Sequence, residues 1–197
     1  LMTARHATGG QGIICTDATY HGNSTEVGKM SARPVSDPRF RSIPFPQSYR
    51  PLAEGVTEDE LCQLYLNKVE EAIDDFADKD IPFAGMIVCS ILANEGLPDI
   101  PAGFMSQAAA LVRAAGGVFI ADEVQAGYCR SGHWWGYQTS DFQPDIVVMG
   151  KPMGNGLPLS AVAANHDLIA AFRSKTGYFN TFASSPMQAA VGMAVLD

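Results

Sequence analysis

The sequence predicts an α/β protein in which a mostly parallel sheet lies between two layers of helices. Two observations support this prediction. From residue 82 onward, short apolar runs alternate with segments of helical periodicity, which is the order of a βαβ protein. The apolar runs are also continuous, without polar residues at every second position, as is typical of strands buried on both faces of a sheet. We therefore expect a single three-layer domain.

Each predicted strand is a short apolar run bounded by turn residues or helices. The runs cover residues 12–16, 84–92, 118–121, 146–149 and 159–164. Residues 31–55, in contrast, contain prolines and arginines without any period. This segment is predicted to be a long irregular loop.

The predicted helices carry apolar residues at spacings of three and four. The first helix covers residues 58–76 and follows a capping box, in which Thr57 and Glu60 each bind the other's backbone amide. Its acidic residues form a solvated face. The remaining helices cover residues 101–115, 167–173 and 186–197.

The composition argues against several classes of function. The chain has 197 residues, a formal net charge of −8 and a pI near 4.9, which disfavours a nucleic-acid partner or an anionic membrane surface. The cysteines are far apart and lack metal-ligand spacing. We therefore expect an acidic cytoplasmic protein with reduced cysteines, without a metal site and without nucleic-acid or membrane partners.

Two residues with catalytic potential follow predicted strands. Asp122 comes directly after the strand at 118–121, and Lys151 follows the strand at 146–149 after one glycine. Ligands of α/β sheets bind beyond the carboxyl ends of the strands, so both side chains could face one ligand. A structural salt bridge, or two unrelated strand ends, would explain the same positions.

The residues that follow Lys151 favour a functional role. They read PMGNGLP, and their glycines allow close backbone approach while their prolines restrict the chain. A lysine in such a loop is predicted to be held away from solvent, and its amine can attack an aldehyde to form a Schiff base. A nucleotide-binding P-loop is excluded because Pro152 follows Lys151, and the sequence lacks the G-x-S-x-G and H-E-x-x-H motifs.

Three longer segments resemble, in the same order, signatures of the class III, fold-type-I aminotransferases, which use pyridoxal 5′-phosphate (PLP). They read FIADEVQAGYCRSG from residue 119, PDIVVMGKPMGNGLPL from residue 144 and NTFASSPMQAAVGMAVLD from residue 180. An earlier segment, ATYHGNS from residue 18, is similar to the family's aromatic–His–Gly turn. The resemblance implies that residues 1–197 form one partial PLP-binding large domain. An N-terminal segment and a C-terminal small domain are then expected to lie outside this sequence.

The resemblance also implies the catalytic residues. Lys151 would hold PLP as a Schiff base and act as the proton shuttle. Asp122 would contact the pyridine nitrogen, so that the ring can accept electrons from the substrate carbon. Gln125 would hydrogen-bond the phenolic oxygen of the ring.

The remaining cofactor contacts are implied in the same way. Tyr20 and Val124 would pack on opposite faces of the ring, and His21 would either join them or only support Tyr20. Thr181 would bind the phosphate in the neighbouring subunit of a homodimer with shared active sites. Arg130 is assigned to the structure of its loop rather than to substrate binding.

One position departs from the family pattern. Many members carry a Glu-Pro pair where the strand that precedes the helix at 101–115 ends, whereas this chain has Ser90 and the residues that follow it there. Glu95 lies five residues later and cannot simply take the missing position. The departure concerns the handling of the substrate rather than the binding of PLP.

The function implied by the resemblance is a PLP-dependent transaminase, which moves an amino group from an amine or amino acid donor to a keto or aldehyde acceptor. Because one cofactor serves several reactions, phospho-lyase, aminomutase, racemase and decarboxylase activities are alternatives. A non-catalytic relative that acts as an oligomeric partner is a further alternative. The presence of Asp122, Gln125, Lys151 and Thr181 argues against it.

Overall fold

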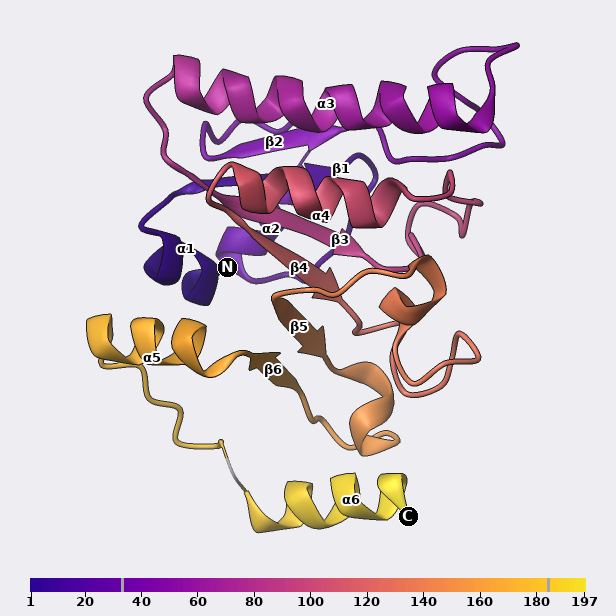
Figure 1. Ribbon diagram of the computed structural model, residues 1–197. Helices are drawn as coiled ribbons and strands as arrows, with labels where there is room; N and C mark the ends of the chain where they lie inside the picture. The colour runs from indigo at the N-terminus through magenta and orange to yellow at the C-terminus, as the bar shows by residue number, and fades with distance from the viewer. Residues whose placement is uncertain (33, 184) are drawn as a thin grey trace.

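The fold is that of a computed structural model, which describes residues 1–32, 34–183 and 185–197. Within these residues a sheet of six strands runs in the order β2-β1-β3-β4-β5-β6 (Figure 1). Neighbouring strands are parallel except β5 and β6, which are antiparallel. The strands are β1 (Gly12–Thr16), β2 (Phe40–Ile43), β3 (Phe83–Cys89), β4 (Val118–Asp122), β5 (Ile146–Met149) and β6 (Ala161–Ala164).

Helices cover both faces of this sheet, so the predicted three-layer α/β fold is confirmed. The helices are α1 (Met2–Thr8), α2 (Thr25–Ser31), α3 (Glu58–Asp78), α4 (Phe104–Ala114), α5 (His166–Lys175) and α6 (Pro186–Leu196). Two short 3-10 helices, η1 (Gly136–Ser140) and η2 (Lys151–Gly154), follow β4 and β5. Among the described residues, no helix combines the length and the apolar character that a membrane crossing requires.

The two faces have separate hydrophobic cores. On one face, α3 and α4 pack their apolar sides on the sheet, with Tyr65, Phe76 and Phe104 fully buried. On the other face, Ala4 of α1 and Met30 of α2 pack against strand residues of the opposite pleat, and α5 adds to this core. The capping box predicted at Thr57 is present at the start of α3.

Several boundaries differ from the predictions. The segment 31–55, expected to be irregular, contains β2, which pairs in parallel with β1. The short helices α1 and α2 were not predicted, because each offers too few residues for a periodic pattern. The strand predicted at 84–92 ends at Cys89, and the helix predicted at 101–115 begins at Phe104. The end of β3 matters for the site, because Ser90 is then the first residue after the strand and lies at the carboxyl edge of the sheet.

Candidate active site at the carboxyl ends of the strands

A cavity of about 200 Å³ lies at the carboxyl ends of the central strands. The residues lining it come from the loop after β1, the end of β3, the end of β4 and the start of η2. They are Tyr20, His21, Gly22, Cys89, Asn94, Asp122, Val124, Gln125 and Lys151. All the cofactor-binding residues named from the sequence therefore line one cavity, with the exception of Thr181.

Asp122 is the last residue of β4 and is 7% exposed. Its Oδ1 accepts a hydrogen bond from the backbone amide of Val124 at 3.0 Å, and its Oδ2 lies 2.6 Å from Nδ1 of His21. Both carboxylate oxygens are thus held, one from within its own turn and one from a residue 101 positions away. This arrangement fixes the orientation of the carboxylate at the wall of the cavity.

His21 does more than support Tyr20. The imidazole is almost completely buried, with a side chain 1% exposed, and both of its nitrogens have partners. Nδ1 contacts Asp122, and Nε2 lies 2.6 Å from Oγ1 of Thr19. The ring therefore links the loop after β1 to the end of β4.

Lys151 is the first residue of η2, and its Nζ donates a hydrogen bond of 2.7 Å to Oε1 of Gln125. The sequence predicted a lysine held away from solvent, and this prediction is wrong: Lys151 is exposed at the mouth of the cavity. The amine is directed by its bond to Gln125 rather than by burial. Gly150 allows the chain to lie close to Val124, since a Cβ at position 150 would come within 3.3 Å of the Val124 side chain.

Ser90 faces away from the cavity and is completely buried. Its Oγ donates a hydrogen bond of 2.6 Å to Oε1 of Glu123. The Glu123 carboxylate also accepts hydrogen bonds from the backbone amides of Gly136 and Tyr137. A carboxylate at position 90 would therefore meet another buried carboxylate whose oxygens are already in use. Ser90, the residue that departs from the family pattern, thus contributes to the hydrogen bonds around Glu123 that connect η1 to the end of β4.

Two other residues discussed from the sequence also lie outside the cavity. Arg130 donates from Nη2 to the carbonyl oxygen of Val124 at 2.8 Å, which agrees with a role in loop structure. Glu95 accepts a hydrogen bond of 2.7 Å from Thr16 on its Oε1. Its other oxygen is buried without a hydrogen-bond partner among the described residues. Glu95 therefore lies outside the cavity that Asp122 and Lys151 line.

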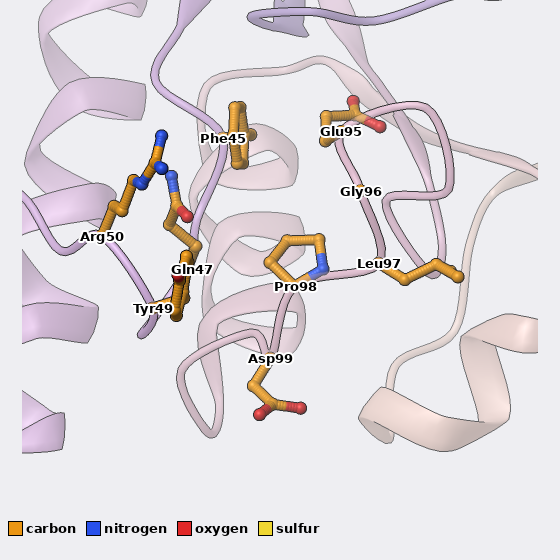
Figure 2. Close-up of a pocket in the computed structure, with 9 residues that line it drawn as sticks. All are labelled: Phe45, Gln47, Tyr49, Arg50, Glu95, Gly96, Leu97, Pro98 and Asp99. Atoms are coloured by element: carbon orange, nitrogen blue, oxygen red, sulfur yellow. The ribbon is translucent and has the colours of Figure 1, made fainter.

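A second and larger cavity has a volume of about 450 Å³ (Figure 2). Phe45, Gln47, Tyr49 and Arg50 form one wall, and the segment 95–99 forms the other. None of the nine residues that line it was named as a cofactor contact from the sequence. Volume alone would select this cavity, whereas the amine, the carboxylate and the aromatic ring converge in the smaller one.

Three residues near the smaller cavity were missed by sequence reasoning. Asn94 donates from Nδ2 to the carbonyl oxygen of Tyr20 at 3.2 Å and so joins two loops at the rim. Cys89 pairs with Asp122 across β3 and β4, and burial raises the pKa of its thiol. Thr19 holds His21. The position of Cys89 at the end of a predicted strand could have indicated that it lies near the cavity. Nothing in the sequence indicates the contacts of Asn94 with Tyr20 or of Thr19 with His21.

Thr181 lies apart from this cavity, in the segment 176–185 between α5 and α6. It is exposed, and so are its aromatic neighbours Tyr178, Phe179 and Phe182, the last two at 82%. Helix α6 has no buried residue, although most of its side chains are apolar. This end of the chain therefore presents apolar surface that the described residues leave uncovered.

Comparison with known proteins places the chain among relatives that extend well beyond it. The family model of the class III aminotransferases matches residues 1–197. Human mitochondrial alanine–glyoxylate aminotransferase 2 is 42% identical over 134 residues, which cover 68% of this chain and 26% of that protein. The mitochondrial homolog 2 of Arabidopsis thaliana is 35% identical over 204 residues, covering all of this chain and 41% of that protein.

A solved structure resembles the whole arrangement. A phospholyase from Arthrobacter, in complex with phosphoethanolamine, superposes with a TM-score of 0.91 at 35% sequence identity. The match covers 98% of this chain and 47% of the phospholyase. The chain thus spans less than half the length of each of these proteins.

The comparison corrects one prediction. The human and Arabidopsis relatives are named as mitochondrial proteins. The cytoplasmic location expected from the acidic composition and the reduced cysteines is therefore wrong. Composition gave no basis for distinguishing between two compartments that both hold soluble acidic enzymes.

Proposed function

Because this chain belongs to the class III aminotransferase family, we propose that the protein is a PLP-dependent transaminase. Its substrates are an amine or amino acid donor and a keto or aldehyde acceptor. The observation that carries the proposal is the convergence of Lys151, Asp122 and Gln125 on one cavity from two separate segments of sequence, the end of β4 with the turn after it and the start of η2. The match of the class III aminotransferase family model to residues 1–197 also supports transamination.

The residues of the cavity fit PLP. The cofactor offers a basic ring nitrogen, a phenolic oxygen, an aldehyde and two flat faces. The cavity offers a carboxylate, a carboxamide, a primary amine, an aromatic ring and a branched aliphatic side chain, from Asp122, Gln125, Lys151, Tyr20 and Val124. Each of these groups therefore has a chemically suitable partner in the cavity, with Asp122 at the ring nitrogen and Tyr20 and Val124 at the faces.

When bound, PLP supplies an electron sink for the bond that breaks at the substrate carbon. Lys151 would hold the cofactor through Nζ and, when its amine is free, would carry the proton to and from that carbon. A carboxylate of Asp122 would favour a proton on the ring nitrogen. Gln125 accepts a hydrogen bond of 2.7 Å from Nζ of Lys151 and would orient the phenolic oxygen of the bound cofactor.

We propose further that the working unit is a homodimer with shared active sites. Exposed Thr181 would reach the phosphate in the partner's site, and the uncovered apolar residues of α6 would be buried between the subunits. We also propose that residues 1–197 correspond to part of a PLP-binding large domain. The N-terminal segment and the small domain would account for the additional length of the relatives.

A second reaction has a specific observation in its favour. The Arthrobacter phospholyase matches this chain with a TM-score of 0.91 at 35% identity. A phospho-lyase would eliminate phosphate from a phosphorylated amine and return the cofactor to its PLP form. Transamination, in contrast, leaves the cofactor in its pyridoxamine form after the donor has reacted.

One experiment separates the two reactions. The full-length protein in its PLP form is mixed with a panel of amines, amino acids and phosphorylated amines, while absorbance and free phosphate are recorded together. Conversion to the pyridoxamine form without phosphate release supports the transaminase and identifies the donor class. Phosphate release with retention of the PLP form supports the phospho-lyase. If no compound produces either change, the proposed function fails.

A further inference from the structure

Thr19 occupies a position that the proposed reaction does not explain. It lies in the loop between β1 and α2 and is 4% exposed. Its carbonyl oxygen accepts a hydrogen bond from Oγ of Ser31 at 3.1 Å, which anchors the loop to the end of α2. Its hydroxyl lies 2.6 Å from Nε2 of His21. Thr19 does not line the cavity, so it acts on the site only through a neighbour.

The contacts continue from Thr19 to the wall of the cavity. His21 lies 2.6 Å from Asp122 through its other nitrogen, and the two side chains are 1% and 9% exposed. An ionised carboxylate can only accept hydrogen bonds, so Nδ1 of His21 must carry the proton of this contact. Nε2 then faces a hydroxyl, which can either donate or accept. The arrangement satisfies both nitrogens of a buried ring.

The two contacts together decide which way the imidazole faces. A rotation of the ring by 180° would place carbon atoms where both nitrogens now lie. In that orientation the hydrogen bonds to Thr19 and to Asp122 would be lost at the same time. Asp122 alone favours this orientation of the ring through one hydrogen bond, and Thr19 adds a second hydrogen bond that favours the same orientation.

We propose that Thr19 is a positioning residue that acts through His21 on Asp122. By holding the imidazole in one orientation, Thr19 fixes the position of the His21 nitrogen that hydrogen-bonds Oδ2 of Asp122. The backbone amide of Val124 donates to Oδ1 of the same carboxylate. The carboxylate then presents its remaining lone pairs to the cavity in one geometry. The consequence for catalysis rests on the proposed function, because it requires a ring nitrogen opposite Asp122.

The test uses the full-length protein and a signal that does not depend on the cofactor. A short hydrogen bond from an imidazole to a carboxylate moves its proton to unusually low field in the NMR spectrum. The low-field Nδ1 proton of His21 is recorded in ring-labelled apo protein and assigned by its disappearance in Asp122→Asn. Thr19→Val removes the hydroxyl at nearly constant volume, and Thr19→Ser retains it.

A matched control is available three residues earlier. Thr16 is also completely buried, but its hydroxyl bonds Glu95 and not His21. Thr16→Val therefore creates a similar defect outside the chain of contacts. We expect the low-field signal to persist in the wild type, in Thr19→Ser and in Thr16→Val. It should be lost or broadened by exchange in Thr19→Val and in the smaller variant Thr19→Ala.

In the holoenzyme, Thr19→Val should lower kcat about tenfold, the population change that one hydrogen bond of ordinary strength allows, with little effect on KM. Thr19→Ser should restore most of the loss. An unchanged low-field proton in a folded Thr19→Val or Thr19→Ala protein overturns the proposal, as does its equal loss in Thr16→Val. Failure of the protein to bind PLP would instead refute the proposed function and leave the NMR result standing.

Discussion

Nζ of Lys151 and Oε1 of Gln125 are joined by a hydrogen bond of 2.7 Å that connects η2 to the turn after β4. The bond directs an otherwise exposed amine toward the cavity without burying it. Lysine amines react with aldehydes as the neutral base, and a single acceptor positions the amine while leaving it accessible. Among the lysines that the structure describes, Lys151 is the one that lines this cavity.

We expect Lys151 to be the residue that binds the cofactor covalently. Borohydride reduction of the PLP-loaded protein, followed by peptide mass mapping, should place the pyridoxyl group on Lys151. The Lys151→Ala variant should lose this adduct and its turnover. A pyridoxyl group on Lys29, Lys68, Lys79 or Lys175 in the wild type would show that the assignment is mistaken.

Replacement of Asp122 by Asn should slow the reaction on the order of 10²-fold or more, because the charge opposite the ring nitrogen is removed while the size is kept. The variant should still bind PLP to Lys151, which absorbance and borohydride mapping can verify. Single-turnover kinetics with the identified donor then measures the loss. Turnover close to that of the wild type would remove the electron-sink role from Asp122.

Substitutions at position 90 should change stability more than substrate use. Ser90→Ala removes one of three donors to buried Glu123 and should lower the free energy of unfolding by about 1 kcal/mol. Ser90→Glu should destabilise the protein more strongly, since it brings two carboxylates together in a buried site. Urea denaturation measures both effects. A Ser90→Glu protein of normal stability and raised kcat/KM would contradict this explanation of the family departure.

The thiols should react in an order set by exposure and by the pKa of Cys89. Burial raises the pKa of this thiol, so less thiolate is present at a given pH and its reaction with thiol reagents is slow. Cys129 is exposed and should be labelled first at pH 8, as time-resolved mass mapping can follow. Cys129→Ser should remove the fast phase. Labelling of Cys89 at the same rate as Cys129 would show that the cavity opens readily.

Mixed dimers should reveal whether Thr181 acts across a subunit interface. A Lys151→Ala chain is combined with a Thr181→Ala chain in the full-length protein. If Thr181 serves the partner's site, the mixed dimer has one site with both residues intact and one with both missing. Activity at limiting PLP should then exceed that of either variant alone. If mass measurement confirms mixed dimers but activity does not rise, Thr181 serves its own chain and the shared-site proposal fails.

Local sequence patterns predicted most of the elements. The capping box at Thr57 and the apolar spacing after it placed α3, and continuous apolar runs placed β3, β4 and β5. Short elements such as β2 and α2 were missed, because a few residues cannot establish a period. Their burial comes from long-range packing, which no local window contains.

The sequence by itself determined that Asp122 and Lys151 follow strands of an α/β sheet, and its longer signatures named the residues around them. Only the tertiary structure decided that His21 bonds Asp122, that Ser90 turns to Glu123 and that Lys151 is exposed beside Gln125. The physical reason is the order of the strands. The loop after β1 reaches the end of β4 because β3 alone separates them in the sheet, whereas 101 positions separate His21 from Asp122 in the chain.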